Sequence, residues 1–377
     1  MIYLDYAANS KVDKEVLDTF YNITDKYFAN PNSNHKLGRI VKELIDKTTK
    51  EIADKLNILP EEIIYTSGAT ECNNLVVKGI CERYKNNGKH IILSSLEHSS
   101  LIAPATIMQD KGFDVDLIPV TKDGIIDINE LKKLIRDDTI LVSVCSIDSE
   151  LGIKQPIEEI GKILKDYPNI HFHTDASQAI GKVSIDFRNV DLITISPHKF
   201  YGLNGFGALI KKKDVMLKPI LNGGKSTTVY RSGTPVVGNI AALSKALDIA
   251  LDKQEERNKY VSNLNKIIVD KLKTYKEVHI NNLDNSIPYI INFSIKGVKS
   301  LDFVKMLEDN DIYVSAKASC CPSGTPSKSV YAKTHDKNLA SSSIRVSLCH
   351  LTTIDEINTF LSVFDKCYKE LEKDGKI

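Results

Sequence analysis

Apolar positions along the chain follow two alternating spacings, one typical of helices and one typical of short buried strands. A helical spacing runs through residues 37–56. After it, short apolar runs alternate with longer amphipathic stretches as far as residue 196. We expect strands at residues 63–65, 91–93, 115–120, 140–147, 171–174 and 191–196, and helices at 69–84, 99–111, 128–136 and 157–167. This alternation predicts an α/β fold, with a mostly parallel sheet sandwiched by helices.

The pattern changes from about Asn239 onward. One long helical stretch extends to about residue 275, and a polar stretch that we expect to be a loop covers residues 315–342. Further strands are expected at residues 278–280, 289–295 and 344–348, and further helices at 301–310 and 354–373. We therefore predict a large domain over residues 11–250 and a smaller α+β domain over residues 251–377, with residues 1–10 packing alongside the small domain.

Composition narrows the possible functions. The 377 residues include 50 Lys and Arg and 49 Asp and Glu, and this net charge of +1 gives no basic excess for a dedicated nucleic-acid binder. No run approaches the ~18 apolar residues that cross a membrane, and the first residues lack the positive region of a signal peptide. Seven cysteines without framework spacing favour a reducing compartment, so we expect the protein in the cytoplasm.

The first candidate motif is Thr66-Ser-Gly-Ala-Thr-Glu71, between an expected strand and an expected helix. Ligands of open α/β sheets bind beyond the carboxyl ends of the strands. Gly68 permits a tight turn, and the following backbone N–H groups with the Thr70 hydroxyl could hold a phosphate. A capped helix without a ligand explains the same residues, and the motif alone favours that reading.

An acid and a lysine follow two later strands. Asp175 ends one strand, and a buried acid there needs a cation, such as a protonated ring nitrogen. Lys199 follows the next strand, and lysine is the residue that forms a Schiff base with an aldehyde. With the phosphate motif, these two residues describe a pyridoxal-phosphate site. His171 and His173 share a strand face with Asp175, but no further ligand is identifiable, so we expect no metal.

Three further features of the sequence each allow more than one interpretation. His98 follows a strand, where it could stack on a planar cofactor, shuttle protons or simply form a structural hydrogen bond. Cys320 and Cys321 lie in the polar stretch near Lys317, whose charge would favour a reactive thiolate, yet an inert surface thiol is an equal alternative. Arg345, within an apolar strand, needs either a substrate carboxylate or an internal ion pair.

Together these motifs resemble the cysteine desulfurases of the class V aminotransferase fold. The resemblance rests on the lysine motif Ser196-Pro-His-Lys199 and on His173-Thr-Asp-Ala-Ser-Gln178, Thr66-Ser-Gly-Ala-Thr-Glu71, Glu97-His98, Arg231-Ser-Gly-Thr234, Ser342-Ser-Ile-Arg345, Tyr3-Leu-Asp-Tyr-Ala-Ala-Asn9 and Asn30-Pro-Asn-Ser-Asn-His35. These motifs occur in family order over nearly the whole chain. They imply a fold-type I transferase that depends on pyridoxal 5'-phosphate.

The resemblance also implies a role for each matched residue. Lys199 would hold the cofactor and move the Cα proton, Asp175 would pair with the pyridinium nitrogen, and Cys320 would be the sulfur nucleophile. The remaining expected contacts are Gln178 with the ring phenolic oxygen, His98 with the ring face, Ala69, Thr70, Ser196 and His198 with the phosphate, Ser149 with the cofactor, Thr234 with the phosphate of the partner subunit in a homodimer, and Arg345 and Asn30 with the substrate L-cysteine.

The implied reaction removes sulfur from L-cysteine, leaving L-alanine and a persulfide on Cys320. The persulfide would pass to an acceptor protein for iron–sulfur cluster assembly or for thiolation of tRNA or a cofactor. A selenocysteine lyase, another cysteine lyase of the same fold and a catalytically weak sulfur-relay partner are the alternatives. The chain also departs from the family pattern: Ser149 replaces an asparagine, Pro197 replaces a glycine, residues 223–230 differ, and a one-residue gap would exchange Cys320 for Cys321.

Overall fold

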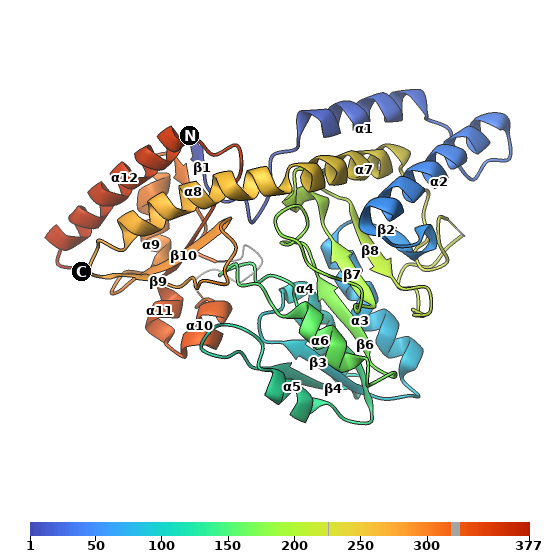
Figure 1. Cartoon of the computed structure of the whole chain (residues 1–377), viewed down its shortest axis with the longest axis horizontal. Coiled ribbons are helices and arrows are strands. Elements are labelled where there is room, and N and C mark those ends of the chain that lie inside the picture. Colours follow the sequence, from blue (N-terminus) through green and yellow to red (C-terminus); the bar gives the residue numbers. More distant parts are fainter. Residues whose placement is uncertain (225, 318–324) are drawn as a thin grey trace.

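The computed structural model describes residues 1–224, 226–317 and 325–377, and its largest sheet has seven strands within these ranges. Their order is β2-β8-β7-β6-β5-β3-β4 (Figure 1). The bounds are β2 Ile63–Thr66, β3 His90–Ser94, β4 Asp114–Ile118, β5 Thr139–Ser143, β6 His171–Asp175, β7 Leu192–Ile195 and β8 Gly207–Lys211. In this sheet β8 is antiparallel to both of its neighbours, β2 and β7, and the other four pairings are parallel, so the prediction of a mostly parallel sheet is confirmed.

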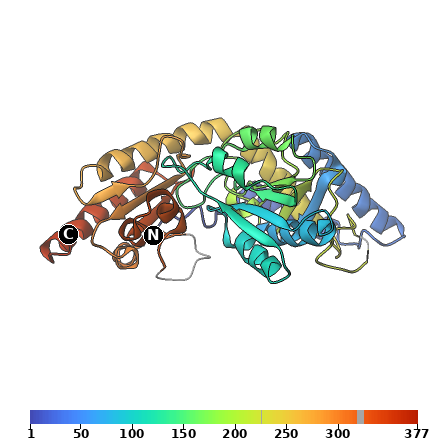
Figure 2. The same ribbon diagram turned by 90° about the horizontal axis from the view of Figure 1, so that it is seen from below.

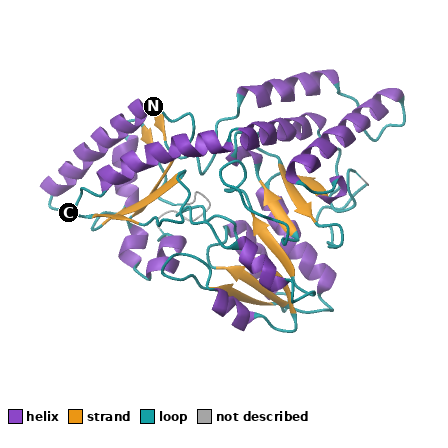
Figure 3. Ribbon diagram, in the orientation of Figure 1, coloured by secondary structure: helices purple, strands orange, loops and turns teal. Residues whose placement is uncertain are grey.

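Helices cover both faces of this sheet because its strands are apolar on both sides. Leu141 of β5 packs in a cluster with α3 (Ala69–Tyr84) and α4 (Ser99–Gln109), whereas its neighbour Val142 packs in the cluster that includes α6 (Ile157–Leu164) and α7 (Val237–Asp252). Successive side chains of a strand point to opposite faces, so one strand supplies both cores. The short helix α5 (Ile128–Leu134) follows β4 near the sheet edge (Figure 3).

Two long helices precede the sheet in the chain. The predicted helix at residues 37–56 is confirmed as α2 (Lys36–Leu56). Helix α1 (Lys14–Lys26), which we did not predict, begins after Asp13, whose side chain accepts a hydrogen bond from the backbone N–H of Glu15. Both helices lie beside α7 in Figure 1. No helix within the described ranges is both long and apolar enough to span a membrane.

The C-terminal part holds a second sheet of order β12-β10-β9, all antiparallel. Its strands are β9 Val278–Ile280, β10 Ile290–Ile295 and β12 Ser343–Ser347, and the helices beside them are α8 Gln254–Leu272, α9 Ser300–Glu308 and α12 Ile354–Lys373 (Figure 2). Near the N-terminus, β1 (Ile2–Tyr3) pairs in parallel with β11 (Ile312–Tyr313). The first residues of the chain therefore lie with its C-terminal part.

Three expected elements differ from the structure. The single helical stretch at residues 239–275 is two helices, because Lys253 between α7 and α8 leaves helical geometry with ψ 9°. The expected strand at 140–147 ends at Ser143. The expected loop at 315–342 contains two short helices, α10 (Lys328–Thr334) and α11 (Lys337–Ser341), because Ser327 and Asp336 cap their first backbone N–H groups.

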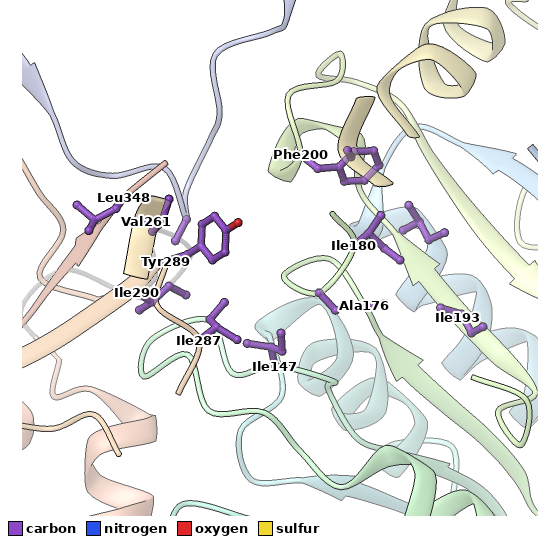
Figure 4. Close-up of a cluster of buried hydrophobic side chains, with 14 of the residues drawn as sticks. Ile147, Ala176, Ile180, Ile193, Phe200, Val261, Ile287, Tyr289, Ile290 and Leu348 are labelled. Carbon is purple, nitrogen blue, oxygen red and sulfur yellow. The ribbon is translucent and has the colours of Figure 1, made fainter. Parts of the chain in front are cut away.

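One continuous apolar core joins the two parts of the chain. Figure 4 shows Ala176, Ile180 and Phe200 from the large sheet region facing Tyr289 and Ile290 from the start of β10. This core fixes the strand ends of the large sheet next to the C-terminal sheet. The division into two domains near residue 250 stays a prediction.

Candidate active site

A cavity of about 350 Å³ lies at the carboxyl ends of the large sheet's strands, within the size range of ligand pockets. Most of the expected site residues meet in its lining. These are Ala69, Thr70, His98, Ser149, Asp175, Gln178, Ser196, His198, Lys199 and Arg345. They come from strand ends, a helix start and the C-terminal sheet, so the fold collects residues that are far apart in the sequence.

One side of the cavity is the first turn of α3. Gly68 has a φ of 145°, which favours glycine, and it precedes Ala69 and Thr70 at the helix start. The first backbone N–H groups of a helix have no acceptor within it, so they suit an anion. Glu71, in the same turn, forms an ion pair with Arg231 at 3.0 Å. Burial raises the pKa of Glu71, but the hydrogen bonds from Arg231 and Ser67 outweigh burial and lower it.

His198 and Ser196 add to the anion side of the cavity. Ser196 Oγ lies 3.0 Å from His198 Nδ1. Burial, followed by the charges of Lys199 and Lys182, lowers the pKa of His198 to about 4. The imidazole is therefore neutral at neutral pH, and it can donate one hydrogen bond without adding a charge.

Asp175 presents a buried carboxylate whose two oxygens are both held. Asn73 Nδ2 donates to Oδ2 at 2.9 Å, and the backbone N–H of Ser177 donates to Oδ1 at 2.9 Å. Within the described ranges, no lysine or arginine forms an ion pair with this acid. A buried carboxylate without such a partner fits a cationic ring nitrogen.

The two histidines of β6 are engaged away from the cavity. His173 lies 2.8 Å from Ser143 Oγ through Nδ1 and 3.0 Å from Thr194 Oγ1 through Nε2, and burial lowers its pKa to about 4. The ring of His171 packs against Tyr84, with 4.3 Å between the ring centroids. Both histidines therefore contact other side chains of the protein.

Lys199 reaches the cavity from the short 3₁₀ turn η2 (Pro197–Lys199) that follows β7. Its Nζ donates to the carbonyl oxygens of Ala7 and Ala8, at 2.8 and 2.6 Å. Gln178 Nε2 donates to the same Ala7 oxygen at 2.9 Å. The N-terminal segment thus forms part of the site, which strand-end reasoning alone did not predict.

His98 caps the start of α4 with its ring. Nδ1 accepts a hydrogen bond from the backbone N–H of Ser100 at 3.1 Å and lies 2.7 Å from Ser100 Oγ. Ser100 Oγ in turn accepts a hydrogen bond from Asn73 Nδ2 at 2.8 Å. With Nδ1 as acceptor, a neutral ring carries its proton on Nε2.

Arg345 is 1% exposed, and it forms an internal ion pair, which is one of the two contacts expected for it. Its Nη2 forms an ion pair with Asp5 Oδ1 at 2.7 Å, and its Nη1 donates to the backbone oxygen of Ser149 at 2.9 Å. Arg345 and Ser149 also line the cavity. The internal ion pair exists, and binding of a substrate carboxylate stays a prediction.

Two expected residues, Asn30 and Thr234, do not line this cavity. Asn30 is exposed in the loop between α1 and α2, where Oδ1 accepts a hydrogen bond from the backbone N–H of Asn32. Thr234 is exposed before α7. Neither lines the cavity of the single chain. Cys320 and Cys321 lie outside the described residues.

The described residues on either side of the two cysteines contact each other and the site. Lys317 Nζ donates to the backbone oxygen of Thr325 at 2.8 Å and also to the Thr325 hydroxyl. Ser315 pairs with Arg345 through their backbones, with 3.1 Å from the Ser315 nitrogen to the Arg345 oxygen. Ser315, a few residues before Cys320 in the sequence, therefore lies next to a residue that lines the cavity.

Comparison with known proteins agrees with this arrangement. The family model Aminotransferase class-V matches residues 2–360. The chain is 37% identical to a NifS/IcsS protein homolog of Lactobacillus delbrueckii subsp. bulgaricus, over 99% of this chain and 98% of the relative. It is 35% identical to a cysteine desulfurase IscS of Dictyoglomus turgidum, over 98% and 95%. A solved NifS-like protein superposes with a TM-score of 0.91 at 30% identity, covering 98% of this chain and 99% of that one.

This chain belongs to the aminotransferase class-V family, and its fold is the fold of NifS-like proteins. The resemblance inferred from the motifs is confirmed, and so is the predicted fold class. The family match spans both sheets, so the large sheet and the C-terminal sheet belong to one family unit.

Proposed function

We propose that this protein is a pyridoxal-phosphate-dependent cysteine desulfurase, which converts L-cysteine to L-alanine and keeps the sulfur as a persulfide on Cys320. The observation that carries the proposal is that Lys199 and Asp175, from the ends of neighbouring strands, line one cavity in which Asp175 has no lysine or arginine ion-pair partner among the described residues. The names of the full-length relatives support the same reaction.

The lining residues offer the contacts that this cofactor needs, and each would bind a different part of it. When bound, pyridoxal phosphate supplies an aldehyde for a lysine amine and a ring that takes up electrons from the substrate Cα. Lys199 would hold the aldehyde carbon and carry the Cα proton. Asp175 would keep the ring nitrogen protonated, and Gln178 would donate a hydrogen bond to the ring oxygen. His98 would lie against the ring.

The phosphate would lie at the start of α3. Ala69 and Thr70 offer backbone N–H groups and a hydroxyl there, and Ser196 and His198 offer side-chain donors from the opposite strand end. In a homodimer, the exposed Thr234 of each chain would reach the phosphate of the partner site. The homodimer is therefore part of the proposal.

The substrate and the sulfur would use the C-terminal part of the chain. Arg345 would exchange its contact with Asp5 for the carboxylate of L-cysteine, and Asn30 would contact the same substrate. The Cys320 thiolate would attack the substrate sulfur, so that an S–S bond forms as the Cβ–S bond breaks. Protonation of Cβ, which keeps the electron pair of the broken bond, then completes the methyl group of alanine. We propose an acceptor protein for the persulfide, in iron–sulfur cluster assembly or in thiolation, and the cytoplasm as the compartment.

The test is alanine formation from L-cysteine by the purified, cofactor-loaded protein with a reductant. We expect a visible absorbance band that borohydride bleaches, alanine in the product, and a persulfide on Cys320 by mass spectrometry. Lys199→Ala should remove the band. Absence of alanine at every cysteine concentration would refute a desulfurase and favour a sulfur-relay partner.

A pair of cysteine variants separates this reaction from the other lyases. Cys320→Ser should abolish most cysteine turnover, while Cys321→Ser, its matched control, should retain it. Full turnover by Cys320→Ser would instead indicate a β-eliminating cysteine lyase, which needs no protein thiol. Loss of turnover only in Cys321→Ser would move the nucleophile to that residue.

A further inference from the structure

A second lysine is buried directly behind the candidate site. Lys182 is 6% exposed, and its ammonium donates a hydrogen bond to Gln178 Oε1 at 2.6 Å. It also lies 6.0 Å from the centre of the Tyr289 ring. Lys182 and Lys199 border one small cavity, beside Ala7. Among the described residues no carboxylate forms an ion pair with Lys182, and a buried lysine without such a partner is rare.

Lys182 and the Ala7 oxygen together fix which way the Gln178 amide points, because each contacts one end of it. A charged lysine has only donors, so the atom that faces it must be the amide oxygen. The amide nitrogen therefore points the other way, where it donates to the Ala7 oxygen and borders the main cavity. A side-chain amide has two N–H groups, so Nε2 can donate to a ligand as well as to Ala7.

The charged groups around Lys182 are mostly of its own sign. Burial, followed by the positive charges of Lys199 and Arg345, lowers the pKa of Lys182 to about 7, and Cys349 opposes them. The neighbouring phenols do not compensate, because burial raises the pKa of Tyr6, Tyr201 and Tyr289 and keeps them neutral. Each buried cation here disfavours a second one.

We propose that Lys182 is a positioning residue of this site, which fixes the Gln178 amide toward the cofactor and disfavours a positive charge on the nitrogen of Lys199. The first effect follows from the 2.6 Å hydrogen bond, and the second from the cavity that the two lysines share. A lysine amine must be uncharged to attack an aldehyde or to take a proton, so a nearby cation makes Lys199 more reactive. This inference rests on the proposed cofactor.

The experiment titrates the visible absorbance band of the cofactor-loaded protein against pH and measures the dissociation constant of pyridoxal phosphate. In Lys182→Met the band should fade at a pH higher by up to about one unit, because loss of a positive charge that Lys182 carries below its pKa of about 7 favours protonation at Lys199. Cofactor affinity should fall about three- to tenfold, because the amide of Gln178 is no longer fixed. Lys182→Arg should restore both values.

Two further variants keep the result decisive. Lys182→Gln removes the charge but keeps a donor, so the midpoint should still rise, and it decides the charge effect if Lys182→Met does not fold. Lys211→Met is the matched control, since Lys211 is another buried lysine, held by backbone oxygens such as that of Val215 and outside the cavity lining. It should titrate as the wild type does.

Unchanged midpoints and affinities in Lys182→Met and Lys182→Gln would overturn the role of Lys182, and so would an equal shift in Lys211→Met. These outcomes leave the proposed function intact, because the wild-type protein still binds the cofactor. A wild-type protein that gains no visible band with pyridoxal phosphate would refute the proposed cofactor, and the role of Lys182 with it.

Discussion

Asn73 Nδ2 lies 2.9 Å from Asp175 Oδ2, and the same amide nitrogen donates to Ser100 Oγ, which contacts the His98 ring. Thr194 Oγ1 donates to the amide oxygen of Asn73, so the orientation of this amide is fixed. One buried side chain of α3 therefore holds both the acid and the imidazole of the candidate site. The same helix supplies the phosphate cradle at its start.

Asn73→Ala should weaken binding of pyridoxal phosphate by about tenfold, since one oxygen of Asp175 loses its donor. The matched control is Asn74→Ala, because the next asparagine of α3 is partly exposed and donates within its own helix, to the Thr70 oxygen. Equilibrium titration of both variants with the cofactor measures the difference. Equal affinities would show that Asn73 does not support the acid.

Arg345→Lys should raise the KM for L-cysteine by about tenfold or more with a smaller effect on kcat. Lysine keeps a positive charge for Asp5 but lacks the planar fork that binds a carboxylate with two hydrogen bonds. Steady-state alanine formation measures both constants. Arg257→Lys is the control, because Arg257 is a buried arginine outside the cavity lining. A KM equal to that of the wild type would leave Arg345 with its ion pair alone.

Glu97→Gln should make the protein more resistant to urea at alkaline pH. Burial raises the pKa of Glu97 to about 8 although Ser94 and the Cys145 backbone N–H donate to it. The folded-state pKa of Glu97 lies above its ordinary value of 4.5. The protonated side chain therefore makes its full contribution to the stability of the fold below pH 4.5. That contribution is lost as the pH rises through 8.

A glutamine mimics the protonated acid and avoids this loss, which we expect to be on the order of 2 kcal/mol. Urea unfolding of wild type and variant at a series of pH values measures it. Glu82→Gln is the control, because the hydrogen bond from Lys111 lowers the pKa of this exposed acid. Parallel stability curves for wild type and Glu97→Gln would mean that Glu97 is ionised at neutral pH.

Lys317→Met should reduce the persulfide formed on Cys320 by about threefold or more while cofactor affinity stays the same. The Lys317 ammonium joins the two described ends of the segment that carries both cysteines, through Thr325. Without this contact, the separation of these ends is no longer fixed, which lowers the chance that the thiol meets the substrate. Mass spectrometry after one turnover counts the persulfide. Lys328→Met, on the exposed face of α10, should behave as the wild type.

The spacing of apolar residues predicted most elements, because helices and strands repeat their buried positions at different intervals. The residues of α3 were predicted with both ends correct, since the turn at Gly68 marks its start. Helix α1 shows the same kind of spacing, with Val16 and Phe20 facing the core, but it was not assigned. The break at Lys253 leaves no mark in the apolar pattern, because α7 and α8 continue the same buried stripe on either side of it.

The sequence by itself determined that Asp175 and Lys199 share one edge of the sheet, because neighbouring parallel strands end at the same edge. Only the tertiary structure decided what holds them, since Asn73 and Asp175 are 102 positions apart and Lys199 and Ala7 are 192 apart. Arg345 and Asp5, 340 positions apart, meet for the same reason. Periodicity is a local property of the chain, whereas these contacts arise from packing two sheets into one core, and no local pattern encodes that.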